Sequence, residues 1–135
     1  MKKLLFLMML LMGFNNAWGQ DYISDNKFDD AIHERSAFGD DETSIVVIEF
    51  WAKFNDVNSF KDWDKVKGIT HYYRVDIATS PNAKKEYRVR MAPTIIIFKN
   101  GVAQETFKAG LDLECPVTLS ELQDAIEEVR TASQF

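Results

Sequence analysis

The chain has 135 residues, of which 46% are hydrophobic, and a formal net charge of −5. This length is enough for one compact domain with its own core, but not for two. An acidic chain in which no basic cluster stands out argues against nucleic acid or an anionic membrane as a partner.

The first nineteen residues are typical of an export signal. A short basic start precedes an unbroken apolar run from Leu4 to Met12, and Ala17-Trp18-Gly19 places small residues where a signal peptidase cuts. The run is too short to span a bilayer, which takes roughly 20 residues. We therefore expect residues 1–19 to be cleaved. Residues 20–135 would then form one exported domain without a membrane span, periplasmic or secreted.

The first half of the exported part predicts two helices and two strands. A capping sequence followed by helical spacing predicts a helix over residues 27–36. Residues 45–51 are apolar on both faces apart from Glu49, as in a central parallel strand. Apolar residues at helical intervals predict a second helix over 56–67, and alternation predicts a strand over 69–77.

The second half predicts a helix, a hairpin and a final helix. Serine as the cap and proline at the first position predict a helix over residues 80–87. A strand over 94–98 leads into Lys99-Asn100-Gly101, a tight-turn sequence that tolerates positive φ, and a return strand follows over 103–108. A capping box at 118–121 begins the last helix. The order predicts an α/β fold.

Three segments together resemble the thioredoxin family: Phe50-Trp51-Ala52, Arg90-Met91-Ala92-Pro93-Thr94 and Phe98-Lys99-Asn100-Gly101. The likeness extends over nearly the whole chain after the leader. It implies a thioredoxin-like fold, in which a central mixed β-sheet has helices on both faces, and it implies a cis peptide bond before Pro93.

The chain departs from this family at the redox motif. Asn55 and Asn58 stand at the Cys-x-x-Cys spacing, and the segment after Asn58 is shorter than the family usually has. A carboxamide can neither attack a disulfide nor resolve a mixed one, so we expect a redox-inactive protein. Asn55 and Asp56 suit a helix start, as cap and as first-turn acid.

Glu49 is a carboxylate inside an apolar strand, where it would cost roughly several kcal/mol unless it is paired. The resemblance places it at the family's buried acid, with Arg74 at the companion lysine. We interpret Glu49 and Arg74 as a structural buried pair, and an acid–base role is the alternative.

Cys115 is the chain's only cysteine, so an internal disulfide is impossible. It is either an inert loop thiol or a monothiol that pairs with another exported protein or with a second copy. In the second case it is the one catalytic candidate, for a disulfide oxidoreductase.

The resemblance implies a binding face around the cis-proline loop, where the family pairs with an extended peptide through main-chain hydrogen bonds. We therefore expect a protein or peptide partner, while a structural subunit of a cell-envelope assembly is a further alternative. We expect no metal and no cofactor, because His33 and His71 have no further ligands at metal-binding spacing. The expected binding residues are Phe54, Asn55, Val57, Asn58, Met91, Ala92, Pro93 and Leu111.

Overall fold

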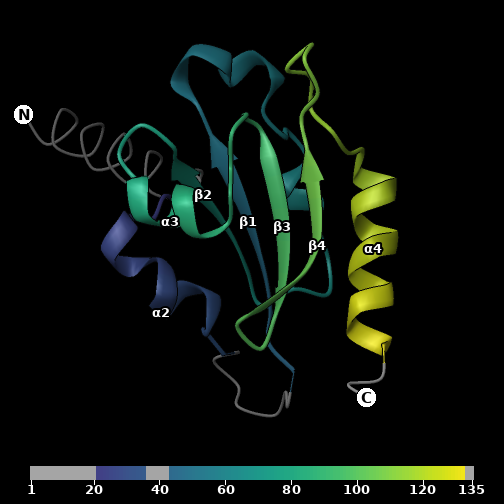
Figure 1. Ribbon diagram of the computed structural model, residues 1–135. Helices are drawn as coiled ribbons and strands as arrows, with labels where there is room; N and C mark the ends of the chain where they lie inside the picture. The colour runs from purple at the N-terminus through teal and green to yellow at the C-terminus, as the bar shows by residue number, and fades with distance from the viewer. Residues whose placement is uncertain (1–20, 36–42, 133–135) are drawn as a thin grey trace, which may run out of the picture.

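The computed structural model describes residues 21–35 and 43–132, so the expected leader lies outside the described residues. A sheet in the order β2-β1-β3-β4 forms the centre, with α2 and α3 on one side and α4 on the other (Figure 1). In chain order, with η for a 3-10 helix, the elements are η1 (Asp25–Lys27), α2 (Phe28–Ile32), β1 (Ile45–Trp51), η2 (Lys53–Asn58), η3 (Trp63–Lys65), β2 (His71–Asp76), α3 (Pro81–Glu86), β3 (Thr94–Lys99), β4 (Val102–Lys108) and α4 (Leu119–Thr131).

The sheet is mixed. β1 pairs with β2 in parallel and with β3 antiparallel, and β3 and β4 form an antiparallel hairpin. Two neighbours and two covered faces explain why β1 is apolar almost throughout. The expected α/β fold is confirmed. Because β1 and β4 both run antiparallel to β3, the loops that follow β1 and β4 emerge at the same end of the sheet.

The sheet separates two core clusters. Alternate β1 side chains point to opposite faces, so Val46, Ile48 and Phe50 pack with α2 and α3. Ile45 and Val47 pack with α4 on the other face. The Glu49 side chain points to the same face of the sheet as Ile45 and Val47.

The hairpin and the last helix follow their sequence signals. Asn100 and Gly101 have φ values of 52° and 82°, as the tight turn requires. At α4 the Thr118 hydroxyl accepts from the Glu121 amide while the Glu121 carboxylate accepts from the Thr118 amide. Both predictions are confirmed.

The predicted helix over 56–67 is wrong. The chain forms two separate turns, η2 and η3, and Ser59 between them is extended, with φ −66° and ψ 159°. The Phe60 amide donates to Glu49 Oε2 at 3.0 Å, and the Phe60 carbonyl accepts from Arg74 Nη2 at 3.4 Å. Backbone groups engaged by the buried pair cannot also join a helical hydrogen-bond ladder.

The predicted helix over 27–36 is longer than the observed one. It begins as η1, and α2 itself covers only Phe28–Ile32. The Glu34 amide donates to the Ala31 carbonyl, three residues back, which tightens and closes the last turn. Residue 36 lies outside the described residues.

Ser80 occupies the predicted cap position and Pro81 begins α3, but the serine does not cap the helix through its side chain. The Ser80 side chain makes no capping hydrogen bond, and its buried hydroxyl has no partner among the described residues. The carboxylate of Asp25, on η1, accepts instead from the amides of Asn82 and Ala83 at 3.0 and 2.9 Å. An acid from another element therefore caps α3.

Candidate functional site

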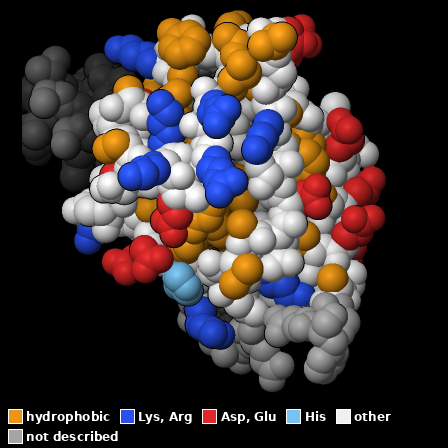
Figure 2. Space-filling model, viewed as in Figure 1, with side chains coloured by type: hydrophobic (Ala, Val, Ile, Leu, Met, Phe, Trp, Pro, Cys, Tyr) orange, Lys and Arg blue, Asp and Glu red, His pale blue; other side chains and the backbone are white. Residues whose placement is uncertain are grey.

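Three large apolar side chains are exposed at the end of the sheet where β1 and β4 finish. Phe54 and Val57 on η2 are 77% and 79% exposed, and Leu111, between β4 and α4, is 92% exposed. Figure 2 shows hydrophobic side chains gathered at this upper end. We call Phe54, Val57 and Leu111 the apolar tip. Grouped exposed apolar side chains of this kind mark interaction surfaces.

Asn55 holds the loops of the apolar tip together. Its Nδ2 donates to the carbonyls of Ala92 at 2.9 Å and Leu113 at 2.8 Å, and its Oδ1 accepts from Asn58 Nδ2 at 2.8 Å. The prediction that Asn55 caps a helix is wrong. The cap position of η2 is Ala52, and Asn55 is buried inside η2 with non-helical φ and ψ.

The expected binding residues lie together but at different depths. The members of the apolar tip are exposed, while Asn58 and Met91 are half-buried. Asn55, Ala92 and Pro93 are buried beneath them, and the Ala92–Pro93 peptide bond is cis. Ala92 is buried and its carbonyl already accepts from Asn55, so only the second lone pair of this oxygen is left for an added peptide strand.

Leu113 was missed by sequence reasoning. It has a φ of 59°, a left-handed conformation that is rare for a leucine, and its carbonyl accepts one of the two Asn55 hydrogen bonds. Position 113 has none of the residues that usually adopt a positive φ, so the sequence gives no signal of this conformation. The loop after β4 is therefore held in place by a contact that only the folded chain reveals.

Glu49 is fully buried and fully paired. Its Oε1 accepts from the Tyr72 hydroxyl at 2.8 Å and from Arg74 Nη2 at 3.1 Å, and its Oε2 accepts from the Phe60 amide. Burial, and then the charge of Glu49, raise the pKa of Tyr72 well above its usual range, so this phenol stays a donor. The carboxylate faces its own chain on both oxygens.

Arg74 links the Glu49 hydrogen-bond network to η2. Its guanidinium lies 5.8 Å from the centre of the Tyr22 ring and 5.7 Å from that of Trp51, and Nη1 lies 3.7 Å from Asp56 Oδ1. Burial is the largest single influence and lowers the pKa of Arg74, but the charge of Glu49 and the hydrogen bonds to Tyr22 and Glu49 together outweigh it, so the net shift is upward. A charged Arg74 thus joins β2 to β1 and η2.

Cys115 is half-buried beside the core cluster on the α4 face. Its Sγ lies 3.4 Å from the Val117 carbonyl oxygen. Burial raises the pKa of the thiol, so less thiolate is present at neutral pH than for an ordinary cysteine. The environment disfavours a nucleophilic role.

The histidines contact their own chain. His33 Nδ1 lies 2.8 Å from the Asp29 carbonyl, and His71 Nε2 lies 2.5 Å from Asp21 Oδ2. Within the described ranges, no group of three or more His, Cys, Asp or Glu could hold a metal ion. In the same ranges no helix has the length and hydropathy needed to cross a bilayer.

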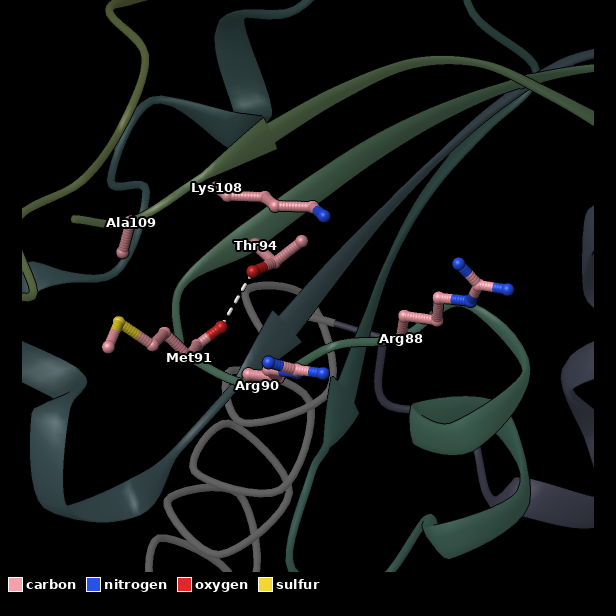
Figure 3. A pocket seen from close by; sticks show the side chains of 6 residues that line it. All are labelled: Arg88, Arg90, Met91, Thr94, Lys108 and Ala109. Carbon is pink, nitrogen blue, oxygen red and sulfur yellow. Dashed lines mark hydrogen bonds between the residues drawn. The ribbon is translucent and has the colours of Figure 1, made fainter.

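Sequence reasoning also missed a basic pocket. Arg88, Arg90 and Lys108 surround a hollow of about 330 Å³ whose remaining lining is Met91, Thr94 and Ala109 (Figure 3). The expectation that the chain has no basic cluster is therefore wrong. Part of the signal was present, since residues 84–90 contain four basic residues, but Lys108 joins them only through the hairpin.

The mixed sheet and its flanking helices define a thioredoxin-like fold, which solved structures share. A mutant thioredoxin from Halobacterium salinarum aligns with a TM-score of 0.57 and 16% identity, over 84% of this chain and 92% of that one. The oxidised thioredoxin of Plasmodium falciparum aligns with a TM-score of 0.56 and 18% identity, over 82% of this chain and 98% of that one.

Sequence comparison shows the family. The family model described as Thioredoxin matches residues 21–117. The thioredoxin of Rickettsia felis is 30% identical over 49% of this chain and 68% of its own length. The chain belongs to the thioredoxin family.

Proposed function

We propose that this chain is an exported, redox-inactive member of the thioredoxin family that binds a protein or peptide through its apolar tip. The observation that carries the proposal is the exposure of Phe54, Val57 and Leu111 on two loops that Asn55 joins. Three large apolar side chains exposed to water on segments that a buried amide ties together favour a partner that covers them.

The absence of redox chemistry follows from the side chains at the motif. On this proposal Asn55 and Asn58 occupy the positions of the family's redox cysteines, and neither can form a disulfide. The Asn55 amide uses both of its hydrogens on the chain's own carbonyls. Cys115 has a raised thiol pKa and no second cysteine to resolve a mixed disulfide.

The partner is held mainly by side-chain contacts. Main-chain pairing at Ala92 would require this buried carbonyl to accept a second hydrogen bond, whereas the apolar tip is open. The buried Glu49–Arg74 pair lies below this surface and supports η2, so its role on this proposal is structural.

Binding is tested with an array of short peptides probed with the purified protein. We expect wild type to retain peptides rich in apolar residues, and Phe54→Glu and Leu111→Glu each to weaken retention by about tenfold. The matched control is Val102→Glu, because Val102 is also apolar and 59% exposed but lies at the opposite end of β4. Equal retention by all four proteins contradicts the proposal.

Redox inactivity is tested separately by insulin reduction in the presence of dithiothreitol. We expect neither wild type nor Cys115→Ser to exceed the uncatalysed rate. Turnover by wild type that disappears in Cys115→Ser would identify a monothiol oxidoreductase instead.

A further inference from the structure

We propose that the basic pocket binds Asp or Glu side chains of the partner segment whose apolar residues cover the apolar tip. This inference rests on the proposed function and adds the chemistry of the partner. It predicts a segment in which an apolar stretch adjoins an acidic one.

The pocket collects positive charge from two separate parts of the chain. Arg88 and Arg90 come from the segment between α3 and β3, and Lys108 ends β4. Their charged ends lie around one opening (Figure 3). Among the described residues, no carboxylate forms an ion pair with any of the three. Two guanidinium groups provide donors suited to bidentate binding of carboxylates.

The pocket adjoins the apolar tip directly. Ala109 lines the pocket and lies two residues before Leu111 of the tip, a span of at most roughly 7 Å. Met91 lines the pocket and immediately precedes Ala92, the residue to which Asn55 bonds. In Figure 2 the Lys and Arg side chains lie just below the hydrophobic ones at the upper end. One extended segment can therefore contact both surfaces.

An arginine at position 88 carries a conformational cost. It follows α3 with a φ of 53°, where glycine is the usual residue. The Arg88 amide donates to the Lys85 carbonyl and the Val89 amide to the Lys84 carbonyl, the hydrogen bonds of a Schellman motif. Glycine would fit this backbone better, so the arginine is not explained by the helix end.

The charges of the molecule are unevenly placed. The chain is acidic as a whole, and one group of acids lies along α4 at the right of Figure 2, while Lys and Arg side chains gather over the upper middle of this face. Glu121, Asp124, Glu127 and Glu128 are all exposed on that helix. A positive face on an acidic protein attracts acidic partners and orients them.

A peptide carboxylate fits these observations better than a nucleic acid phosphate. A polyanion would meet the repulsion of a net negative protein. The apolar tip also calls for apolar side chains next to the negative charges, and a peptide supplies both on one backbone.

The test uses three fluorescent short peptides, acetylated and amidated at their ends so that only side chains carry charge. All three carry the same leucine and phenylalanine block, followed by glutamates in the first, glutamines in the second and lysines in the third. Binding is measured by anisotropy at about 0.05 M and about 0.5 M salt, where screening of exposed charges differs strongly. A single-stranded oligonucleotide of similar length is the fourth probe.

We expect the glutamate peptide to bind about tenfold more tightly than the glutamine peptide at low salt, with the preference reduced at high salt. Arg88→Gly and Arg90→Gln should each remove most of this preference and leave the glutamine peptide unaffected. The charge-matched control is Lys67→Gln, which removes an exposed lysine beside α4 and should change nothing. Arg88→Gly should also raise the urea midpoint, so its loss of binding cannot come from unfolding.

The outcomes separate this inference from the proposed function. Equal binding of the glutamate and glutamine peptides, both abolished by Phe54→Glu, overturns the acidic partner and supports the apolar tip. Tighter binding of the oligonucleotide than of the glutamate peptide overturns the inference in favour of phosphate. Binding of no peptide at all overturns both.

Discussion

Asn55 and Glu49 are buried polar side chains, and both form hydrogen bonds with other groups of the same chain. Asn55 is 7% exposed and Glu49 is fully buried. Each takes part in at least three hydrogen bonds, so neither has an unmet requirement that would point to a ligand. Replacing either should therefore be felt in stability.

Glu49→Gln should cost about 2–3 kcal/mol of unfolding free energy. The neutral amide leaves the Arg74 guanidinium without its buried counter-charge, and the amide NH2 turns toward groups that are themselves donors. Urea denaturation measures the loss. The exposed pair Glu127–Arg130 supplies the control, since Glu127→Gln should cost less than about 1 kcal/mol. Equal losses in both variants would show that burial does not matter here.

Asn55→Ala should cost about 2 kcal/mol, because the carbonyls of Ala92 and Leu113 lose their donor. Amide hydrogen exchange should also quicken between β4 and α4, where the loop is no longer tied to η2. The control is Asn58→Ala, which removes only the bond to Asn55 Oδ1 and should cost less. A greater loss for Asn58→Ala would contradict this account.

At the scale of elements, strands were predicted better than helices. Residues 45–51 and the hairpin carry their own signals, namely a β-branched apolar run and an Asn-Gly turn. The helix over 56–67 failed because the apolar spacing is local, whereas Phe60 is bound by Glu49 and Arg74 from other strands. Sequence spacing does not report backbone groups that distant side chains engage.

The cap of α3 is a second long-range contact, and it gives a prediction. Asp25→Ala should cost about 1 kcal/mol, because the amides of Asn82 and Ala83 lose their acceptor. Ser80→Ala is the matched control at the same helix end. Its buried hydroxyl has no partner among the described residues, so removing it should cost nothing or stabilise the protein. Thermal denaturation of both variants tests the assignment, and a larger loss for Ser80→Ala would reverse it.

Asp56 on η2 gives a prediction about pH. The Trp51 indole N–H donates to its carboxylate at 2.7 Å, and this bond, with Lys61 and Arg74, lowers the pKa of Asp56 from its ordinary value of 3.8. A lowered folded-state pKa contributes stability above pH 3.8, and this contribution is lost as the pH falls through the folded-state pKa.

Wild type should accordingly be more stable than Asp56→Asn near about pH 7, and this difference should shrink near about pH 3. The variant keeps an oxygen that can accept from Trp51 and loses only the charge. Urea denaturation of both proteins at the two pH values measures the difference. A gap that widens on acidification would contradict the assignment.

For the whole molecule, stability comes from two core clusters on either side of one sheet, without a disulfide. We expect the urea midpoint to be the same with and without a reducing agent, since Cys115 has no intramolecular partner. Non-reducing electrophoresis gives the complementary reading, a single monomer band. A midpoint that shifts with reductant, together with a dimer band, would show that Cys115 links two copies.

The sequence could predict which residues lie together at the candidate site, but not which of them are buried. Family resemblance grouped η2, the cis-proline loop and Leu111 correctly at one end of the sheet. It did not reveal that Asn55 turns inward, because that depends on carbonyls of Ala92 and Leu113 from distant segments. Nor did it reveal the basic pocket, which forms only when Lys108 is placed beside Arg88 and Arg90.

The face of β1 on which Glu49 lies affects the register of the central strand. A shift of β1 by a single residue would exchange its two faces and turn the carboxylate toward the cluster of α2 and α3. The buried members of that cluster are all apolar, and the donors from Tyr72, Arg74 and the Phe60 amide would remain on the opposite side. A shift in register would thus bury the Glu49 carboxylate, unpaired, among apolar side chains. The buried acid therefore disfavours misalignment of the central strand.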